Sequence, residues 1–179
     1  MDLSTYNHSF SFKNKIGRFL WNITSPILFN LFASRLFKKW RVLVLKCFGA
    51  KIKWSSHVYA SVKIWAPWNL EIGVNSSIGP KVNCYNQGKI VIGSNSIISQ
   101  KTSLCASSHD YKLKNFPLIL KPISIGDGVW IASEAFIGPG IHIGNHVVIA
   151  ARAVVIKNVD ENTIVGGNPA KFIKYRNIE

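Results

Sequence analysis

An aliphatic residue returns at every sixth position through most of the sequence, and this period restricts the fold more than any other feature. The longest uninterrupted run is Ile125, Ile131, Ile137, Ile143, Ile149 and Val155. Neither an α-helix, with a period of about 3.6 residues, nor a simple alternating strand produces this spacing. Short strands joined by tight corners, three to a turn of a narrow prism, do produce it, because the aliphatic side chains then stack inside. We therefore predict a mainly β fold.

The repeat is interrupted most strongly at residues 110–122 (DYKLKNFPLILKP), which contain two prolines and no sixfold spacing. Short slips also occur at residues 70–71 and 85–91. A loop that leaves a regular scaffold is a place where substrate contacts accumulate. We expect a repeat domain over residues 52–167 that carries this loop, followed by a tail over residues 168–179.

Positive charge is concentrated in the first part of the chain. The formal net charge is +14, and residues 1–53 supply +9 of it, from ten Lys or Arg and the single acid Asp2. Aromatic and aliphatic residues stand beside these bases, so residues 1–51 are predicted to form one or two amphipathic helices, divided at Pro26. Two roles are open for this segment. It docks on an acidic membrane surface, or it caps the end of the repeat fold, which we favour because such an end must be covered.

The rest of the composition narrows the class of protein. Hydrophobic residues make up 47% of the chain, which excludes intrinsic disorder. Cys47, Cys84 and Cys105 form no CxxC pair, so we expect neither a disulfide framework nor a zinc knuckle, and we interpret all three as small buried side chains. The uncharged stretch 19–34 is too short for a membrane-spanning helix. No nucleic-acid-binding signature accompanies the basic charge, so no nucleic-acid partner is expected.

Four segments carry a resemblance to a known family. They are WRVLVLKCFGAKI, YNQGKIVIGSNSIISQKTSLCASSHDY, GVWIASEAFIGPGIHIG and GGNPAKFIKYR. The chain resembles the hexapeptide-repeat acyltransferases, and within them the O-acetyltransferases of colanic acid and capsular polysaccharide biosynthesis. This resemblance implies a left-handed parallel β-helix, a homotrimer, acetyl-coenzyme A (acetyl-CoA) as the acyl donor, and a sugar or saccharide hydroxyl as the acceptor.

The residue expected to do the chemistry is His109, which ends a hexad immediately before the loop. A hydroxyl attacks a thioester only as its proton is removed, and a histidine suits this task near neutral pH. The resemblance places the family's catalytic histidine here, so we expect His109 to be a general base in direct transfer within a ternary complex. Asn83 is implied to hold the acceptor hydroxyl or the transition state; the alternative is a corner residue in the left-handed conformation. Asp110 is a third candidate, to orient the imidazole or bind the acceptor.

The same resemblance implies a coenzyme A site in the C-terminal half. Trp130 matches the tryptophan that packs along the pantetheine arm, although a stacked exterior side chain is the alternative. Ser133 and Ala151 fall where backbone groups meet the pantetheine amides. Lys157, Lys171 and Lys174 match basic positions near the nucleotide phosphates. Asn168 and Pro169 match the turn beside them.

Other interpretations of these residues give other functions. A zinc enzyme on the same kind of fold needs three histidines, and position 114, where one of them would stand, is Lys, so no metal is expected. A non-catalytic scaffold that docks on a membrane is a second alternative, and an acetyltransferase for a free small-molecule sugar, amino sugar or xenobiotic is a third. Stabilisation by coenzyme A would favour the enzyme over the scaffold. We expect a cytoplasmic protein, with contact at the inner face of the membrane if the first segment docks there.

Overall fold

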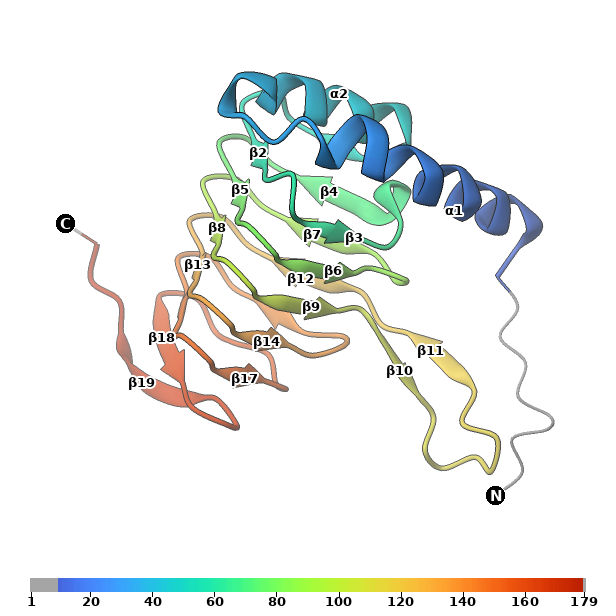
Figure 1. Cartoon of the computed structure of the whole chain (residues 1–179). Coiled ribbons are helices and arrows are strands. Elements are labelled where there is room, and N and C mark those ends of the chain that lie inside the picture. Colours follow the sequence, from blue (N-terminus) through green and yellow to red (C-terminus); the bar gives the residue numbers. More distant parts are fainter. Residues whose placement is uncertain (1–9, 179) are drawn as a thin grey trace.

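Three parallel sheets wind around one core in the computed structural model, which describes residues 10–178 (Figure 1). Residues 1–9, which include Asp2, and residue 179 lie outside the described residues. Strands of successive turns pair in parallel, as Val58 does with Ile78. The result is a parallel β-helix with helices at its N-terminal end, which confirms the predicted fold class.

Each sheet takes one short strand from each turn, and the second sheet also includes β19 (Lys171–Tyr175), which follows the last turn and pairs antiparallel with β18 (Thr163–Gly166). The first sheet contains β1 (Lys51–Ile52), β4 (Leu70–Ile72), β7 (Ile90–Ile92), β12 (Ile123–Ile125) and β15 (His142–Ile143). The second contains β2 (His57–Val58), β5 (Ser77–Ile78), β8 (Ile97–Ile98), β13 (Trp130–Ile131), β16 (Val148–Ile149), β18 (Thr163–Gly166) and β19 (Lys171–Tyr175). The third contains β3 (Lys63–Ile64), β6 (Asn83–Tyr85), β9 (Ser103–Cys105), β14 (Phe136–Ile137) and β17 (Val154–Val155).

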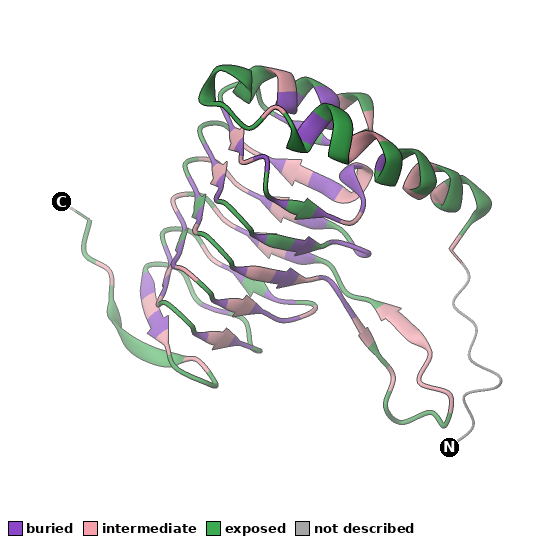
Figure 2. Cartoon of the chain, in the orientation of Figure 1, coloured by how far each residue is buried: buried purple, intermediate pink, exposed green. Residues whose placement is uncertain are grey.

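The repeated aliphatic residues form columns inside the prism. In the second sheet one column consists of Val58, Ile78, Ile98, Ile131 and Ile149, and none of these side chains has exposed surface. Their strand neighbours point outward, so buried residues alternate with more exposed ones along each strand (Figure 2). Burial of one such side chain contributes roughly 1.5–3 kcal/mol, which explains why the sixfold spacing is kept.

The corners between strands use left-handed backbone conformations. Asn75, Asn95 and Asn162 have φ angles of 56°, 55° and 56°, a region that Asn tolerates better than most residues. At Gly128 φ is 64°, and an added Cβ would lie 2.5 Å from Nδ1 of His146 in the next turn. The stacked corners between strands therefore favour Asn and Gly.

Helices cover the N-terminal end of the β-helix (Figure 1). Helix α1 (Phe12–Thr24) continues into a π-helical turn, η1 (Ser25–Asn30), while a 3-10 turn, η2 (Arg35–Phe37), leads into α2 (Lys38–Cys47). Pro26 is the second residue of η1, which follows α1 without a break. No helix in residues 10–178 is long and apolar enough to cross a bilayer.

Two buried side chains join the helices to the first turn of the β-helix. Trp21 of α1 is 3% exposed, and its Nε1–H donates to the carbonyl of Ile64 at 2.8 Å. Arg41 of α2 is also buried, and its Nε–H donates to the carbonyl of Val58 at 2.9 Å. Because both donors meet backbone carbonyls at the open end of the prism, the helices satisfy groups that would otherwise face solvent.

Two further segments depart from the repeat. Strands β10 (Ser107–His109) and β11 (Leu118–Leu120) pair in antiparallel fashion and form a hairpin arm that projects from the β-helix (Figure 1). The segment predicted as a loop thus contains one strand of this hairpin. Strand β19, within the predicted tail, folds back antiparallel on β18. A 3-10 turn, η3 (Pro67–Asn69), comes directly before β4, and residues 70–71, where the sequence repeat slips, are the first two residues of that strand.

Candidate active site

The hairpin arm positions His109. Strand β10 begins with Ser107, which is buried, and ends with His109, which is exposed and pairs in register with Leu118. The tip of the arm turns through Phe116 with φ of 43°, an uncommon angle for an aromatic residue. This turn directs the Phe116 carbonyl back toward the root of the arm.

The imidazole of His109 is oriented by that carbonyl. Its Nδ1 lies 2.6 Å from the Phe116 oxygen, and since a carbonyl only accepts, Nδ1 carries the proton. The Asp110 carboxylate has a different partner: its Oδ1 accepts from the backbone N–H of Lys112 at 3.0 Å. Sequence reasoning considered Asp110 for the orienting role and missed Phe116, because the contact depends on the register of the hairpin.

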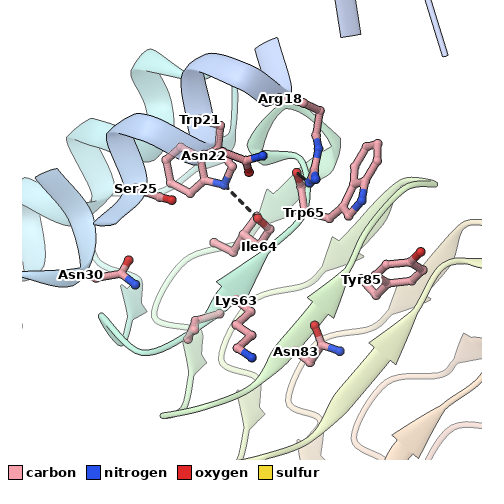
Figure 3. A pocket seen from close by; sticks show the side chains of 11 residues that line it. Arg18, Trp21, Asn22, Ser25, Asn30, Lys63, Ile64, Trp65, Asn83 and Tyr85 are labelled. Atoms are coloured by element: carbon pink, nitrogen blue, oxygen red, sulfur yellow. Dashed lines mark hydrogen bonds between the residues drawn. The ribbon is translucent and has the colours of Figure 1, made fainter. Parts of the chain in front are cut away.

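Asn83 lies in strand β6, and the corner residue with the left-handed conformation here is Lys81, with φ of 59°. The corner alternative for Asn83 is therefore wrong. Its exposed side chain lines a cavity of about 260 Å³ between α1 and the third sheet (Figure 3). The other residues of the lining are Arg18, Trp21, Asn22, Ser25, Asn30, Val62, Lys63, Ile64, Trp65 and Tyr85.

Arg18 and two aromatic rings form one end of this cavity (Figure 3). The Arg18 guanidinium lies 3.9 Å from the centre of the Trp65 ring, and its Nη1–H donates to the Trp65 carbonyl at 2.5 Å. Burial lowers the pKa of Arg18 from its ordinary value, and Tyr85 opposes this shift, yet an arginine stays protonated. The Tyr85 hydroxyl accepts from Nε2 of Gln87 at 2.9 Å, which leaves its own proton to donate.

Asn83 and His109 lie on the same side of the β-helix but do not touch. Asn83 pairs in register with Ser103, and His109 follows Ser103 by six residues. Six extended residues span roughly 20 Å. Within residues 10–178, His109 makes no hydrogen bond with Asn83 or Asp110.

Three of the predicted coenzyme A residues gather near one corner of the prism, where the second sheet meets the third. Trp130 is 48% exposed, and its indole N–H donates to Oγ of Ser99 at 3.0 Å, so the ring is held against the outer surface. Ser133 and Ala151 occupy the same corner in successive turns, where the carbonyl of Ser133 accepts from the N–H of Arg152 at 2.9 Å. Part of the Trp130 side chain thus stays open to solvent along this corner.

The remaining predicted coenzyme A residues lie near the C-terminal end. Lys157 lines a second cavity, of about 180 Å³, together with Phe172 of β19. Lys171 and Lys174 are exposed on β19, and the turn that precedes this strand holds the remaining two candidates, Asn168 and Pro169. The segments that carry Lys157, Lys171 and Lys174 therefore lie at the C-terminal end of the β-helix, away from the N-terminal helices (Figure 1).

The cysteines correct one sequence-based expectation. Cys84 is buried, and desolvation raises the pKa of its thiol to about 12, so it is not a nucleophile at neutral pH. Cys105 is half-buried, but Cys47 is exposed at the end of α2, so the expectation that all three are buried is wrong for Cys47. In residues 10–178 no three His, Cys, Asp or Glu side chains gather closely enough to hold a metal ion.

Known proteins resemble this chain in both sequence and structure. A family model described as bacterial transferase hexapeptide (six repeats) matches residues 122–157. Over 177 residues the chain is 38% identical to the Escherichia coli (strain K12) protein named "Putative colanic acid biosynthesis acetyltransferase WcaF", an alignment that covers 98% of this chain and 97% of that one.

Two solved structures superpose on nearly the whole chain. The maltose O-acetyltransferase of Clostridium difficile 630 does so with a TM-score of 0.82 at 26% identity, covering 94% of this chain and 90% of that one. The hexapeptide-repeat acetyltransferase VCA0836 of Vibrio cholerae O1 biovar eltor, solved with acetyl-coenzyme A, gives a TM-score of 0.82 at 25% identity, covering 94% of this chain and 91% of that one.

Proposed function

This chain belongs to the hexapeptide-repeat acetyltransferases, and from that premise we propose that it transfers the acetyl group of acetyl-CoA to a saccharide hydroxyl. The donor is supported by the acetyl-CoA complex of VCA0836, and the acceptor class by the names of the maltose and colanic acid relatives. The observation in this chain that carries the proposal is the imidazole of His109, held in one tautomer by the Phe116 carbonyl.

His109 acts as the general base in this mechanism. With the proton on Nδ1 donated to Phe116, the lone pair of the neutral ring lies on Nε2. Nε2 takes the proton of the acceptor hydroxyl while the oxygen attacks the thioester carbonyl carbon. A C–O bond forms, the C–S bond breaks, and the proton passes from Nε2 to the departing thiolate of coenzyme A. Donor and acceptor meet in one ternary complex, so no acetyl-enzyme forms.

Asn83 and the cavity above it supply the acceptor site. Within one chain Asn83 and His109 lie too far apart to act on the same oxygen, so the Asn83 amide of one subunit donates to the acceptor oxygen, or to the oxyanion of the transition state, beside the His109 of another subunit. Asn22, Ser25 and the aromatic ring of Tyr85 suit a sugar ring that carries many hydroxyls.

The charge of the cavity narrows the acceptor further. Arg18 and Lys63 are the cations of its lining, and the described lining contains no Asp or Glu. A saccharide unit that carries a carboxylate or phosphate therefore complements the cavity better than a neutral one. Kinetics with a glucuronide and the matched glucoside test this, and the expected result is a lower KM for the glucuronide.

A homotrimer completes the active site. His109 and Trp130 lie on different corners of one chain, so we propose that His109 of one subunit and Trp130 of another face the same bound acetyl-CoA. Co-expression of His109→Ala and Trp130→Ala chains tests this. Mixed trimers then contain some sites with both native residues, and recovered activity is expected. No recovery, or a fully active monomer in light scattering, would contradict the shared site.

The direct test of function is an acetyl-transfer assay. The purified protein is incubated with acetyl-CoA and a panel of nucleotide sugars and lipid-linked oligosaccharides, and free thiol and acetylated product are both measured. Transfer to at least one oxygen acceptor is expected. Coenzyme A itself is expected to raise the melting temperature, because it binds only the folded protein. A protein that neither binds coenzyme A nor releases thiol would overturn the proposal. Because this donor is an intracellular metabolite, the proposed reaction takes place in the cytoplasm.

A further inference from the structure

Helix α1 carries its apolar residues on the side that faces away from the β-helix. Phe12, Ile16, Phe19 and Ile23 follow one another at intervals of four, three and four residues, which places them on one helix face. Phe12 is 79% exposed and Phe19 is 65% exposed, and most of the outer surface of the helix is open (Figure 2). A surface helix normally turns such a stripe toward the core.

The opposite face of α1 makes the contacts with the β-helix. Trp21 is about 180° from Phe12 and its neighbours at about 100° per residue, and it is buried against Ile64. Gly17, on the same inner side, permits close approach, because an added Cβ would lie 3.0 Å from the ring of Trp68. The anchoring of α1 is therefore complete without its apolar stripe.

The exposed apolar surface continues past α1. Leu31 is 75% exposed and Leu36 is 89% exposed, in the segment that joins the two helices. We call the combined surface the outer face of the cap. Its exposed apolar residues are Phe12, Ile16, Phe19, Leu20, Ile23, Ile27, Leu28, Leu31, Leu36 and Phe37. So many exposed apolar residues on one group of helices mark an interaction site.

Basic residues surround the outer face. Lys13 and Lys15 lie on either side of the apolar stripe of α1, and Arg35, Lys38 and Lys39 border its far end. No Asp or Glu occurs in the sequence from Phe10 to Leu70, so nothing in this region offsets the positive charge. An apolar stripe between lysines is the pattern of a helix that lies in the headgroup region of a bilayer.

We propose that the outer face of the cap docks on the surface of a bilayer that contains anionic phospholipid, with α1 parallel to the bilayer plane. The apolar stripe enters the boundary between headgroups and acyl chains, while the flanking lysines contact lipid phosphates. This proposal goes beyond acetyl transfer and stands independently of it.

A second copy of the chain complements this face less well. Each copy has 22 Lys or Arg against 8 Asp or Glu, and Glu71 and Glu134 are each already paired with two basic side chains. Another copy therefore offers little negative charge to the basic outer face of the cap. An anionic bilayer offers both the charge and an apolar layer beneath it.

Docking would bring the acceptor cavity close to the membrane. Trp21, Asn22 and Arg18 line that cavity from the inner side of α1, and the outer face is the other side of the same helix. The cavity therefore lies within about one helix diameter, roughly 10–12 Å, of the proposed lipid surface.

Vesicle flotation with the full-length protein tests the proposal. Vesicles of phosphatidylcholine with about 30% phosphatidylglycerol are compared with vesicles of phosphatidylcholine alone. We expect binding to the anionic vesicles, weakened but not abolished by salt, and little binding to the neutral ones. The variant Lys13→Gln/Lys15→Gln should bind about fivefold more weakly for each lysine removed.

A second variant separates lipid insertion from attraction by charge alone. Phe19→Ser/Ile23→Ser should reduce binding to anionic vesicles by more than about tenfold, since the buried apolar area supplies most of the attachment. The matched control is Val74→Ser, which removes an exposed apolar side chain from a corner of the β-helix. Val74→Ser should bind like the native protein, and all variants should keep the native melting temperature.

Several outcomes would overturn the proposal. One is a native protein that floats with neither kind of vesicle. Another is Phe19→Ser/Ile23→Ser binding as tightly as the native chain, which would assign the face to a purely electrostatic ligand such as nucleic acid. A third is loss of the native oligomer in that variant, which would make the face a contact between subunits. Coenzyme A binding, measured in parallel without lipid, shows separately whether the proposed activity holds.

Discussion

The turns of the β-helix and the segments that leave it use their side chains in opposite ways. Within the turns, residues such as Ile98 and Ile131 are fully buried, and each repeats the environment of the residue one turn before. In the arm and the helical cap, His109 and Phe19 are exposed and have no equivalent in another turn. The repeat therefore supplies a regular scaffold, and both the proposed base and the proposed docking face lie where the repeat stops.

The largest expected effect comes from the arm. Replacing His109 by Ala removes the proposed base, so turnover should fall by roughly 10²–10⁴-fold. The native rate should also fall at acidic pH, because a protonated imidazole cannot accept another proton. Steady-state kinetics with the true acceptor measure both effects.

The control for this substitution is that the fold and the binding of coenzyme A stay unchanged. His109 is exposed, so His109→Ala should melt at the native temperature and bind coenzyme A nearly as the native protein does. A His109→Ala protein with a near-native rate would remove the functional distinction between the arm and the turns, and would reopen a non-catalytic role.

The fold was predictable from sequence because the sixfold period reports one environment many times. Every sixth residue from Ile125 to Val155 marks an inward position, and all six of these residues are buried in the structure. His109 was identifiable as a candidate for a related reason, since it stands where the period ends. Both inferences needed only local spacing together with the family resemblance.

Contacts between segments were not predictable in this way. The bond from His109 to the Phe116 carbonyl depends on hairpin register, and Arg18 meets Trp65 only because α1 crosses the end of the β-helix. The orientation of α1 was also hidden, because an apolar stripe such as Phe12 and Phe19 usually indicates the buried side. Burial of Trp21 on the opposite side reverses that expectation.

A substitution within the turns should act on stability first. Ile98→Ala leaves a cavity in a fully buried column, so the free energy of unfolding should fall by about 2–5 kcal/mol, and Ile98→Val by about 0.5–1.5 kcal/mol. Val74→Ala, at an exposed corner, should change it by less than about 0.5 kcal/mol. Chemical denaturation measures all three. Equal effects at Ile98 and Val74 would mean that the column does not carry the stability of the fold.

Asn83 tests whether a turn can also contribute chemistry. Its strand belongs to the repeat, but its side chain is exposed and lines the cavity under α1. Asn83→Ala should lower turnover by about 10²-fold, the scale for loss of one donor to a transition-state oxygen, with an unchanged melting temperature. Asn75→Ala, at an exposed corner away from the cavity lining, is the control. If both variants keep native turnover, the chemistry is confined to the arm.

The smallest expected effect is a pH-dependent change in the free energy of unfolding, and it arises where Arg41 of the helices contacts His57 of the β-helix. Burial lowers the pKa of His57 below its ordinary value of 6.5, and the charges of Arg41, Lys38 and Arg35 lower it further, because Nη2 of Arg41 lies 3.1 Å from Nε2 of His57. The unfolded chain therefore takes up this proton first as the pH falls. Protonation of His57 in the unfolded chain therefore reduces the free energy of unfolding below about pH 6.5 and has no effect above pH 7.

His57→Gln keeps an acceptor for Arg41 but cannot be protonated, so its stability should fall less than that of the native chain between pH 7.5 and pH 5.5. Denaturation curves at the two pH values measure that difference, in which the contributions of all other titrating groups cancel. An identical loss in both proteins would show that the cap is joined to the β-helix without a titrating contact at His57.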